Sequence, residues 1–536
     1  MARGKKQPGF AVRGVMLDPA RHIERRAFYF DLLPRLAEWG FNTLWWHFVD
    51  NEGVALKLDS HPEVAAPHAF SKPEMKRLLG VAAEAGIDVV PEVETLGHAR
   101  YLTDLPQYAH LRDGTHRVMN AICPSHPETL GIMEDIIREV ADLFPGPYLH
   151  AGLDEADFSG CKRCTRRGRG KPGWWVYAEH VKAIHRIVTD CGKRMVMWAD
   201  HVEHDPELLK ALPRDVILCH WQYRKVDEAA IRRSLDAGFQ VITAPTMCSF
   251  RDMIQPGAHN LRTMDALTEA TAGMVDRGAL GVVNTWWAPQ RGLRDAYVPA
   301  LAYTGRLLSR GASVGKPRFF RTFARDFFGI DAADVGRALW HMHELIVNLG
   351  ELDALLCYSL AGLHRLVNWA ATEEYAARAE QVAQHAATLA SAATKARRNA
   401  DVLGASALAA ELVHTCMANG ERIRLAGEAY EAASVKAGGG WAVEDMASDL
   451  TRAADLIDGA ASSMAVLHGK VADEWARTRY PRYPAWYVDR ESVRALDRQM
   501  LLGRVRMCRD FMGGLSRGFR RDVKAFRAGG PFPGGV

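Results

Sequence analysis

The stretch IERRAFYFDLLPRLAEWGFNTLWWHF, residues 23–48, contains the unit that decides the fold. Its first part has the apolar spacing of an amphipathic helix and stops at Gly40, a residue type common at helix C-caps. The run that follows, TLWWHF, is nearly all apolar, which is typical of a parallel strand buried on both faces. The stretch therefore predicts a helix that leads into a buried strand.

The same alternation recurs along the first half of the chain. The β-rich runs are, in order, GVMLD, TLWWHF, DVVPEV, PYLHAGLDE, RMVMWAD, VILCHW, QVITAPT and LGVVNTWW. Several helical patterns between them end in a glycine, namely Gly40, Gly86, Gly192, Gly238 and Gly278, and the spacing of Ser71 and Glu74 predicts a capping box. Eight such units predict an α/β chain with a (β/α)8 TIM barrel over residues 11–312, after a tail at 1–10. A doubly wound open sheet is the alternative.

The texture changes after the barrel. Ala, Leu, Glu and Arg dominate, and EEYAARAEQVAQHAATLASAATKARRNADVL, residues 373–403, keeps a helical period. The glycines at 438–440 predict a connection between helices. Residues 313–536 are therefore expected to form an all-α C-terminal domain, either a buttress for the barrel or a surface through which the chain forms a homo-oligomer.

Composition excludes several classes of function. Apolar residues make up 48% of the 536 residues and charged residues 25%, as in ordinary globular proteins. The net charge of +4, from 68 basic and 64 acidic side chains, predicts binding neither to nucleic acid nor to a membrane surface. The start MARGKKQPGFAVRG lacks the apolar run of a signal peptide, and no segment is long and apolar enough to span a membrane, so we expect a cytoplasmic protein.

The cysteines leave one question open. There are nine, an odd number, and most lie in apolar segments, so they are expected to be reduced core thiols. Cys161 and Cys164 form a C-x-x-C pair without a second pair at zinc-finger spacing. Plain thiols are the preferred interpretation, with a structural metal or a redox role as alternatives.

Polar and aromatic side chains gather at the ends of the predicted strands, where barrel enzymes place their active sites. In strand order they are Arg13 and Asp18; His47 and Asp50; Glu92, Glu94 and His98; His150, Asp154 and Glu155; Trp198 and Asp200; Trp221 and Tyr223; and Trp286 and Trp287. Each alone has a plain structural explanation, but their joint placement indicates a site. Flat indole rings with carboxylates and an Arg suit a sugar.

Four of these segments resemble glycoside hydrolase family 20, the exo-β-N-acetylhexosaminidases, and most closely its hexosaminidase D-like branch. VRGVMLDPARH resembles the family's R-G-x-x-L-D-x-x-R-H strand, FNTLWWHFVDNEG its N-x-L-x-x-H-x-x-D-x-x-G segment, GIDVVPEVETLGH its I-P-E-x-D-x-x-G-H segment, and HAGLDE its H-x-G-x-D-E signature. MWADH and HWQY look like the W-x-D and W-x-Y strand ends of that branch.

The resemblance implies a retaining reaction in which the 2-acetamido group of the substrate is the nucleophile. Glu155 would protonate the leaving oxygen and then activate water, while Asp154 would orient the acetamido N–H and stabilise an oxazolinium intermediate. We expect the neighbouring negative charge and partial burial to raise the pKa of Glu155. The substrate would be a glycan or glycoconjugate with a terminal β-linked GlcNAc or GalNAc.

The resemblance also implies binding roles. Arg13 would hold the hydroxyls at C3 and C4, and Asp50 would order that side. His98 would tune the catalytic pair through Glu94 or Asp154, with His150 in support. Trp198, Trp221 and Trp286 would shape the sugar and acetamido pockets, and Tyr223 would donate to the acetamido carbonyl. No cluster has clear metal-ligand spacing and no glycine-rich phosphate loop follows a strand, so no metal and no cofactor are expected.

The chain departs from the family pattern at several positions. Glu94 stands where Asp is usual, Leu96 replaces Pro, and Leu153 replaces a small residue. The last strand reads TWWAPQRG without the usual W-x-E, and no Y-x-D follows QVITAPT. Two alternatives therefore stay open: another glycosidase on the same barrel, or a catalytically silent glycan-binding protein. The basic loop GCKRCTRRGRGKPG is either a solvated loop or a lid.

Overall fold

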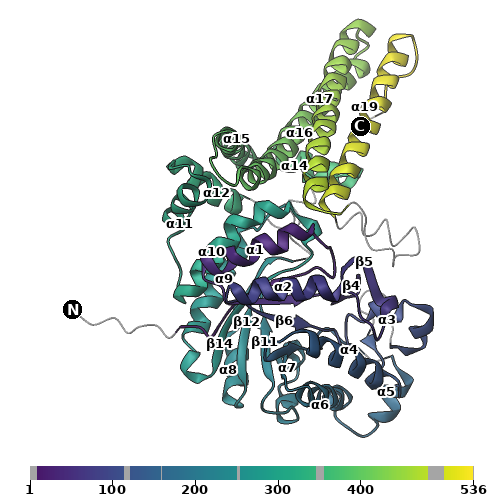
Figure 1. Ribbon diagram of the computed structural model, residues 1–536. Helices are drawn as coiled ribbons and strands as arrows, with labels where there is room; N and C mark the ends of the chain where they lie inside the picture. Colours follow the sequence, from purple (N-terminus) through teal and green to yellow (C-terminus); the bar gives the residue numbers. More distant parts are fainter. Residues whose placement is uncertain are drawn as a thin grey trace.

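The computed structural model describes residues 9–113, 121–157, 160–249, 254–345, 355–480 and 500–534. Its central element is a closed barrel of eight parallel strands, drawn in the lower part of Figure 1. In order around the barrel they are β1 (Val12–Leu17), β2 (Thr43–His47), β6 (Asp88–Glu92), β9 (Tyr148–His150), β10 (Arg194–Trp198), β11 (Ile217–Trp221), β12 (Gln240–Ala244) and β14 (Ala279–Trp286). Because β1 pairs with β14, the sheet is closed, which confirms the predicted TIM barrel and excludes the open sheet.

Helices follow the strands and cover the outside of the barrel (Figure 1). They are α1 (Arg26–Trp39), α2 (Lys72–Glu84), α4 (Thr129–Leu143), α6 (Trp175–Asp190), α7 (Asp200–His204), α8 (Glu228–Asp236), α9 (Ala258–Ala272) and α10 (Val298–Arg310). Smaller elements lie in the connections: β3 (Val49–Asp50), β4 (Gly53–Leu56), β5 (Ala65–Phe70), α3 (Arg100–Thr103), β7 (Arg112–Asp113), β8 (Ala121–Ile122), α5 (Lys162–Arg167) and β13 (Thr246–Cys248). Single helical turns complete them: η1 (Pro62–Val64), η2 (Pro106–Leu111), η3 (Pro206–Lys210), η4 (Val275–Arg277), η5 (Pro289–Arg291) and η6 (Arg294–Tyr297).

The predicted helix ends are observed. Gly40 caps α1 in the left-handed conformation, with φ 102°, and the other four glycines also have positive φ. Ser71 and Glu74 form the predicted capping box at the start of α2. These local signals therefore set the helix boundaries.

Alternation along the strands separates the barrel interior from the layer beneath the helices. On β1, Val12 and Met16 belong to the inner apolar cluster, whereas Val15 and Leu17 belong to the outer one. On β14 and its continuation, Val283 and Trp287 face inward. Side chains in the inward phase beyond the strand ends therefore reach the mouth of the barrel.

The rest of the chain is helical, as predicted. Its helices are α11 (Lys316–Phe323), the π-helical turn η7 (Ala324–Phe328), α12 (Ala333–Leu345), α14 (Leu360–Ala370), α15 (Glu373–Ala393), α16 (Ala400–Gly438), α17 (Val443–Thr478) and α19 (Leu501–Arg527). The connection predicted at the glycines lies between α16 and α17. The helical period expected over 373–403 is interrupted, because α15 ends at Ala393 and Asn399 takes a left-handed conformation with φ 49° before α16.

The long helices α16, α17 and α19 rise from the upper side of the barrel in the view of Figure 1. Arg479, directly after α17, is fully buried and forms an ion pair with Glu24 at 3.0 Å, and it donates to the carbonyl of Pro289 at 2.8 Å. Arg294 donates to the carbonyl of Thr478 at 3.1 Å. The helical region therefore buttresses the loops that follow the first and last barrel strands.

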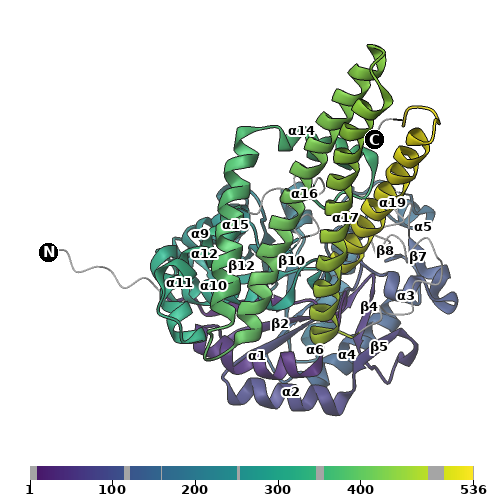
Figure 2. The same cartoon turned by 90° about the horizontal axis from the view of Figure 1, so that it is seen from above.

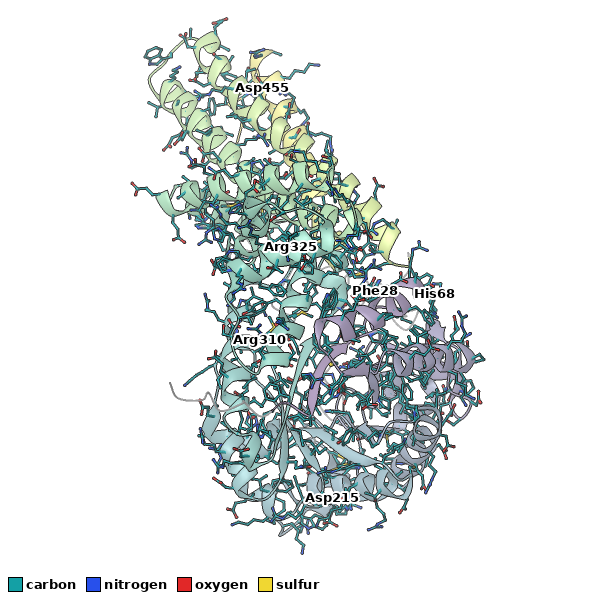
Figure 3. The ribbon with its side chains drawn as sticks, turned by 60° about the vertical axis from the view of Figure 1, so that its left-hand side comes forward. Phe28, His68, Asp215, Arg310, Arg325 and Asp455 are labelled. Carbon is teal, nitrogen blue, oxygen red and sulfur yellow. The ribbon has the colours of Figure 1, made fainter. Side chains whose placement is uncertain are left out.

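Figure 3 shows the same junction with side chains. Phe28 and His68 lie where barrel and helices meet, while Asp455 lies toward the far tip of the helices. The Arg294 guanidinium stands 4.5 Å from the ring of Phe28, and the His68 ring stacks on Tyr480 at 4.3 Å. Among the described helices, none combines the length and hydropathy needed to cross a bilayer. The domain boundary at residue 312 stays a prediction.

Candidate active site

A pocket opens at the carboxyl ends of the barrel strands. The space between its walls is about 510 Å³, part of which is open to solvent. Its lining residues are Arg21, Asp50, Glu94, His98, Asp154, Glu155, Trp198, Trp221, Tyr223, Ser249 and Trp287. A wider hollow between α16, α17 and α19 has no aromatic lining residue. The strand-end pocket is therefore the candidate site.

The backbone after β9 lets two consecutive acids reach this pocket. In an extended strand, neighbouring side chains point to opposite faces. Here Gly152, Leu153 and Glu155 have φ of 64°, 76° and 48°, so the chain coils instead of continuing the strand. Both Asp154 and Glu155 consequently line the pocket.

Two glycines permit the close packing that holds this turn. A Cβ on Gly152 would lie 1.9 Å from a carboxylate oxygen of Glu94, and a Cβ on Gly97 would lie 2.1 Å from the carbonyl oxygen of Asp154. The loop after β6 and the loop after β9 therefore interlock at distances that only glycine allows.

Asp154 is a buried carboxyl group. Its side chain is 12% exposed, and in the described part of the chain its Oδ1 has no hydrogen-bond partner. Burial, against the lowering effect of His98 and with smaller contributions from Asp200 and Glu155, raises the pKa of Asp154 to about 8. Burial together with Asp154 also raises the pKa of Glu94 well above its ordinary value.

Glu155 behaves in the opposite way, and the expectation of a raised pKa is wrong for the free protein. Its side chain is 34% exposed, and its Oε2 lies 3.2 Å from His98 Nε2. This hydrogen bond to His98 lowers the pKa of Glu155, outweighing the effect of partial burial. Its backbone N–H donates to Asp200 Oδ2 at 3.0 Å, which fixes the turn.

His98 connects the acid pair to Asp50. Its Nδ1 lies 3.1 Å from Asp50 Oδ1 and its Nε2 lies 3.6 Å from Asp154 Oδ2. Of the two predicted partners, Asp154 is therefore the one in ion-pair contact. Burial lowers the pKa of His98, but Asp50 and Asp154 raise it well above its ordinary value, so the ring is a cation.

A second ionic layer lies below the pocket. His47 bridges Asp50 and Glu92, with Nε2 2.7 Å from Asp50 Oδ2 and Nδ1 2.8 Å from Glu92 Oε2. Glu92 also accepts from Trp198 Nε1 at 2.7 Å and lies 3.3 Å from His150 Nδ1. Burial lowers the pKa of His150 to about 4, so His150 is a neutral support under the floor.

Aromatic rings form the wall of the pocket. Trp198 stands between Trp45 and Trp287, with ring centroids 5.7 and 5.8 Å away. Trp221 and Tyr223 lie with centroids 5.0 Å apart, and the Tyr223 hydroxyl accepts from Trp287 Nε1 at 2.6 Å. The phenol hydrogen of Tyr223 can therefore donate to a bound molecule.

Two predicted site residues lie elsewhere. Arg13 is in the outward phase of β1 near its start, and its guanidinium donates to the carbonyls of Gly40 and Phe10 at 2.8 Å each, at the opposite end of the barrel. Trp286 is in the outward phase of β14 and stacks on Tyr297 at 4.7 Å. Neither side chain reaches the pocket.

Arg21 and Trp287 line the pocket, where Arg13 and Trp286 were expected. Arg21 is buried and pairs with Asp18 at 2.9 Å and Asp50 at 2.6 Å, and it lies 5.2 Å from the ring of Trp287. Burial lowers its pKa, but these carboxylates raise it well above the ordinary value. The second Arg of VRGVMLDPARH was visible in the sequence, but alternation alone does not show which phase of a strand faces inward.

Two groups of side chains with metal-ligand atoms also occur in the site, and the histidine of each group forms an ion pair with at least one of its carboxylates. His98 lies within 4.8 Å of Asp154 and Glu155, and His47 of Glu92 and Glu94. Although burial lowers the pKa of His47 too, Glu92 and Asp50 raise it well above its ordinary value. The rings of these two groups therefore already contact carboxylates of the same group in the described structure.

Comparison with known proteins identifies the family to which the chain is related. Residues 10–276 match the model for the catalytic domain of glycosyl hydrolase family 20. This part of the chain belongs to glycoside hydrolase family 20. The family match ends before β14, so Trp287 and the unusual TWWAPQRG segment lie beyond it, whereas Arg21, Asp154 and Glu155 lie within it. A closer relation to the hexosaminidase D-like branch stays a prediction.

Curated relatives of this family 20 chain are β-hexosaminidases. The enzyme named so from Vibrio furnissii is 26% identical over 287 residues, covering 47% of this chain and 46% of its own. The one from Akkermansia muciniphila is 29% identical over 203 residues, covering 33% and 41%. The α subunit from Mus musculus is 28% identical over 240 residues, covering 41% and 44%. The chain thus spans less than half the length of these relatives.

Solved structures also align with part of the chain, at lower identity. A family 20 exo-β-N-acetylglucosaminidase from Vibrio harveyi in complex with N-acetylglucosamine aligns with a TM-score of 0.46 and 21% identity, over 57% of this chain and 55% of that one. A β-N-acetylhexosaminidase from Bacteroides fragilis aligns with a TM-score of 0.49 and 22% identity, over 59% and 69%.

Proposed function

We propose that the protein is a retaining exo-β-N-acetylhexosaminidase that releases terminal GlcNAc or GalNAc through an oxazolinium intermediate formed by the substrate's own acetamido group. The observation that carries this proposal is the turn after β9. It directs Asp154 and Glu155 into one aromatic pocket, and among the described residues a buried Asp154 oxygen has no hydrogen-bond partner. Membership of family 20, whose mechanism is substrate-assisted, supports it.

Asp154 and Tyr223 are suited to hold the acetamido group. An amide offers one N–H donor and one carbonyl acceptor. The N–H would donate to Asp154 Oδ1, and the Tyr223 hydroxyl would donate to the carbonyl oxygen. Trp198 and Trp221 would pack against the methyl group and the sugar ring. The carbonyl oxygen would then be positioned to attack the anomeric carbon.

The proton steps fall to Glu155. As the carbonyl oxygen bonds to the anomeric carbon, the bond to the leaving oxygen breaks and Glu155 gives that oxygen its proton. Glu155 then removes a proton from water as the water attacks the same carbon, which opens the oxazolinium ring and restores the configuration. In the free protein Asp154 carries a proton, because its pKa is about 8. The amide N–H of the substrate favours ionised Asp154, so substrate binding would move that proton to Glu155.

Arg21 takes the role that the sequence suggested for Arg13. Its guanidinium is oriented by Asp18 and Asp50, and it lines the pocket beside Trp287. We assign it to the ring hydroxyls at C3 and C4, because a buried guanidinium held by carboxylates is a rigid multiple donor. Asp50 keeps its predicted place on that side.

The natural partner would be a glycan or glycoconjugate with a terminal β-linked N-acetylhexosamine, with no part for nucleic acid or a membrane. The long helices would serve as the buttress described above, and self-association through their outer surface remains part of the proposal. The cytoplasmic location stays a prediction.

The test compares wild type with Glu155→Gln on aryl β-GlcNAc and β-GalNAc substrates whose leaving groups differ in acidity. Loss of a general acid should lower kcat/KM by about 10²- to 10⁴-fold for basic leaving groups and much less for 4-nitrophenol. Glu179→Gln on α6 is the matched control, since the side chains of Glu155 and Glu179 are 34% and 31% exposed. Full activity of Glu155→Gln on every substrate would overturn the assignment.

A second measurement isolates substrate assistance. A thiazoline analogue of the oxazoline should inhibit strongly, and aryl glycosides without the acetamido group should not be hydrolysed. Turnover of the latter at rates similar to the GlcNAc substrate would favour another type of glycosidase. Binding of the thiazoline without turnover of any hexosaminide would favour the silent glycan-binding protein.

A further inference from the structure

Four side chains of metal-ligand type meet outside the pocket, between the loop after β6 and the loop after β9. Asp113 ends β7, Cys123 directly follows β8, and Cys161 and Cys164 belong to the cap and first turn of α5. One ligand atom from each lies within 4.8 Å of all the others. Figure 2 shows β7, β8 and α5 gathered on one side of the barrel.

The spacing of the ligand atoms matches a tetrahedral metal site. Cys123 Sγ lies 3.5 Å from Cys161 Sγ and 3.8 Å from Cys164 Sγ, and Cys164 Sγ lies 3.3 Å from Asp113 Oδ2. Two sulfurs bound to a tetrahedral zinc ion at about 2.3 Å are about 3.8 Å apart. A disulfide instead requires about 2.05 Å. The observed separations therefore fit shared coordination.

Burial and hydrogen bonds support the same conclusion. Asp113 is 1% exposed and Cys123 and Cys164 are 3% exposed each, so the cluster is closed to solvent on most sides. Asp113 Oδ1 has no hydrogen-bond partner among the described residues. The backbone N–H of Cys164 donates to Cys161 Sγ at 3.5 Å, a contact that stabilises a thiolate and orients it.

We propose that Asp113, Cys123, Cys161 and Cys164 bind one structural zinc ion. Three thiolates and one carboxylate complete a four-coordinate shell with no open position, which is the pattern of structural rather than catalytic zinc. Soft sulfur ligands in tetrahedral arrangement favour zinc over magnesium or calcium. The shell would keep a negative charge, and the Lys and Arg residues of the α5 segment KRCTRR offset it.

The ion would tie together the two loops that shape the active site. Ile122 of β8 donates its N–H to the carbonyl of Leu96 at 2.9 Å, in the loop that leads to His98. Cys161 follows Glu155 closely in the same loop, and Arg167 of α5 donates to the carbonyl of Pro124 at 3.0 Å. A metal bridge here restrains both the His98 side and the Glu155 side of the pocket.

The sequence favoured plain thiols because it shows only the C-x-x-C pair. Cys123 lies 38 positions before Cys161, and Asp113 lies 51 positions before Cys164. The pairing of β7 with β8 brings Asp113 and Cys123 close together; in this pair Arg112 faces Ile122 and Asp113 faces Ala121.

Metal analysis of the purified full chain tests the proposal. About one zinc per chain is expected, retained through gel filtration with a weak chelator. Cys161→Ser, at the half-exposed ligand, should lower zinc content at least tenfold, whereas Cys191→Ser, a half-exposed cysteine outside the cluster, should leave it unchanged. The proposal would be overturned if the purified wild-type protein contained no zinc and also took up none when zinc was added.

Cobalt substitution identifies the ligands. Apo protein loaded with Co²⁺ should show the visible bands of a tetrahedral ion and thiolate-to-cobalt charge transfer, both lost in Cys161→Ser. An octahedral spectrum, or a disulfide among these cysteines found by thiol titration, would contradict the assignment. Metal content and spectra are measured without substrate, so they are independent of the hexosaminidase proposal.

Discussion

Replacement of Asp154 by Asn should abolish activity while stabilising the fold. The substitution keeps the shape of the side chain and removes its charge. In wild type, burial raises the pKa of Asp154 to about 8, whereas its ordinary value is 3.8. At 1.36 kcal/mol per pKa unit, ionising Asp154 in the fold costs on the order of 5 kcal/mol.

The sign of the pH dependence follows from linkage. A carboxyl whose pKa is raised in the fold stabilises it fully below the ordinary pKa, and this contribution is lost as pH rises toward about 8. Wild-type stability should therefore fall between about pH 4 and pH 8 through this group. The Asn side chain does not ionise, so the stability of Asp154→Asn does not fall in this way. Its Tm should therefore exceed that of wild type at pH 8.5 and approach it at pH 4.

The loss of activity follows from the charge. His98 Nε2, a cation, lies 3.6 Å from Asp154 Oδ2, and an oxazolinium ion would lie at a similar distance. At about 4 Å and an effective dielectric constant of about 20, the attraction is about 4 kcal/mol, or about 10³-fold in rate. Because the acid pair loses its proton above about pH 8, wild-type kcat/KM should fall there.

The assay combines calorimetry with kcat/KM on 4-nitrophenyl β-GlcNAc between pH 5 and 9. Asp190→Asn, at the exposed end of α6, is the control for charge removal and should change neither property. Activity is expected to fall while Tm at pH 8.5 rises, whereas misfolding would lower both. A variant with activity within tenfold of wild type, or with a lower Tm than wild type at pH 8.5, would refute this reasoning.

Five further substitutions, two of them matched controls, test the pocket residues and the buttress. Arg21→Lys should raise KM at least tenfold because the forked donor is lost, whereas Arg13→Lys should leave KM unchanged; equal effects would contradict the placement of Arg21. Trp287→Phe should raise the thiazoline inhibition constant by about tenfold through the lost Tyr223 hydrogen bond and ring area, and Trp286→Phe should instead lower Tm with the inhibition constant unchanged. Arg479→Met should lower the free energy of unfolding by about 3–5 kcal/mol, measured by urea denaturation, because its buried carboxylate partner is left unpaired; a wild-type midpoint would show that the pair contributes nothing.

Local patterns were sufficient for the architecture. Each barrel strand is buried on both faces and therefore appears as an apolar run, and the glycines that end the helices need positive φ, as at Gly40 and Gly278. Strand order follows from chain order in a barrel, so eight runs in sequence were enough. The acid pair and His98 were also identified, because strand ends meet at one face.

Side-chain direction and charge were decided by the tertiary structure. Arg13 and Trp286 stand at strand positions of the wrong phase, and only the register of β1 against β14 shows which residues face inward. The pKa order of Asp154 and Glu155 depends on burial and on the position of His98, which comes from another loop.

The sequence by itself thus determined the barrel, the helical region and the location of the chemistry, because periodicity, caps and strand ends are local properties of the chain. Only the tertiary structure decided which arginine and which tryptophan enter the pocket, which acid holds the proton, and that Asp113 and Cys123 join the C-x-x-C pair. These depend on distances between residues far apart in the chain, set by strand register and loop packing, which a one-dimensional pattern does not contain.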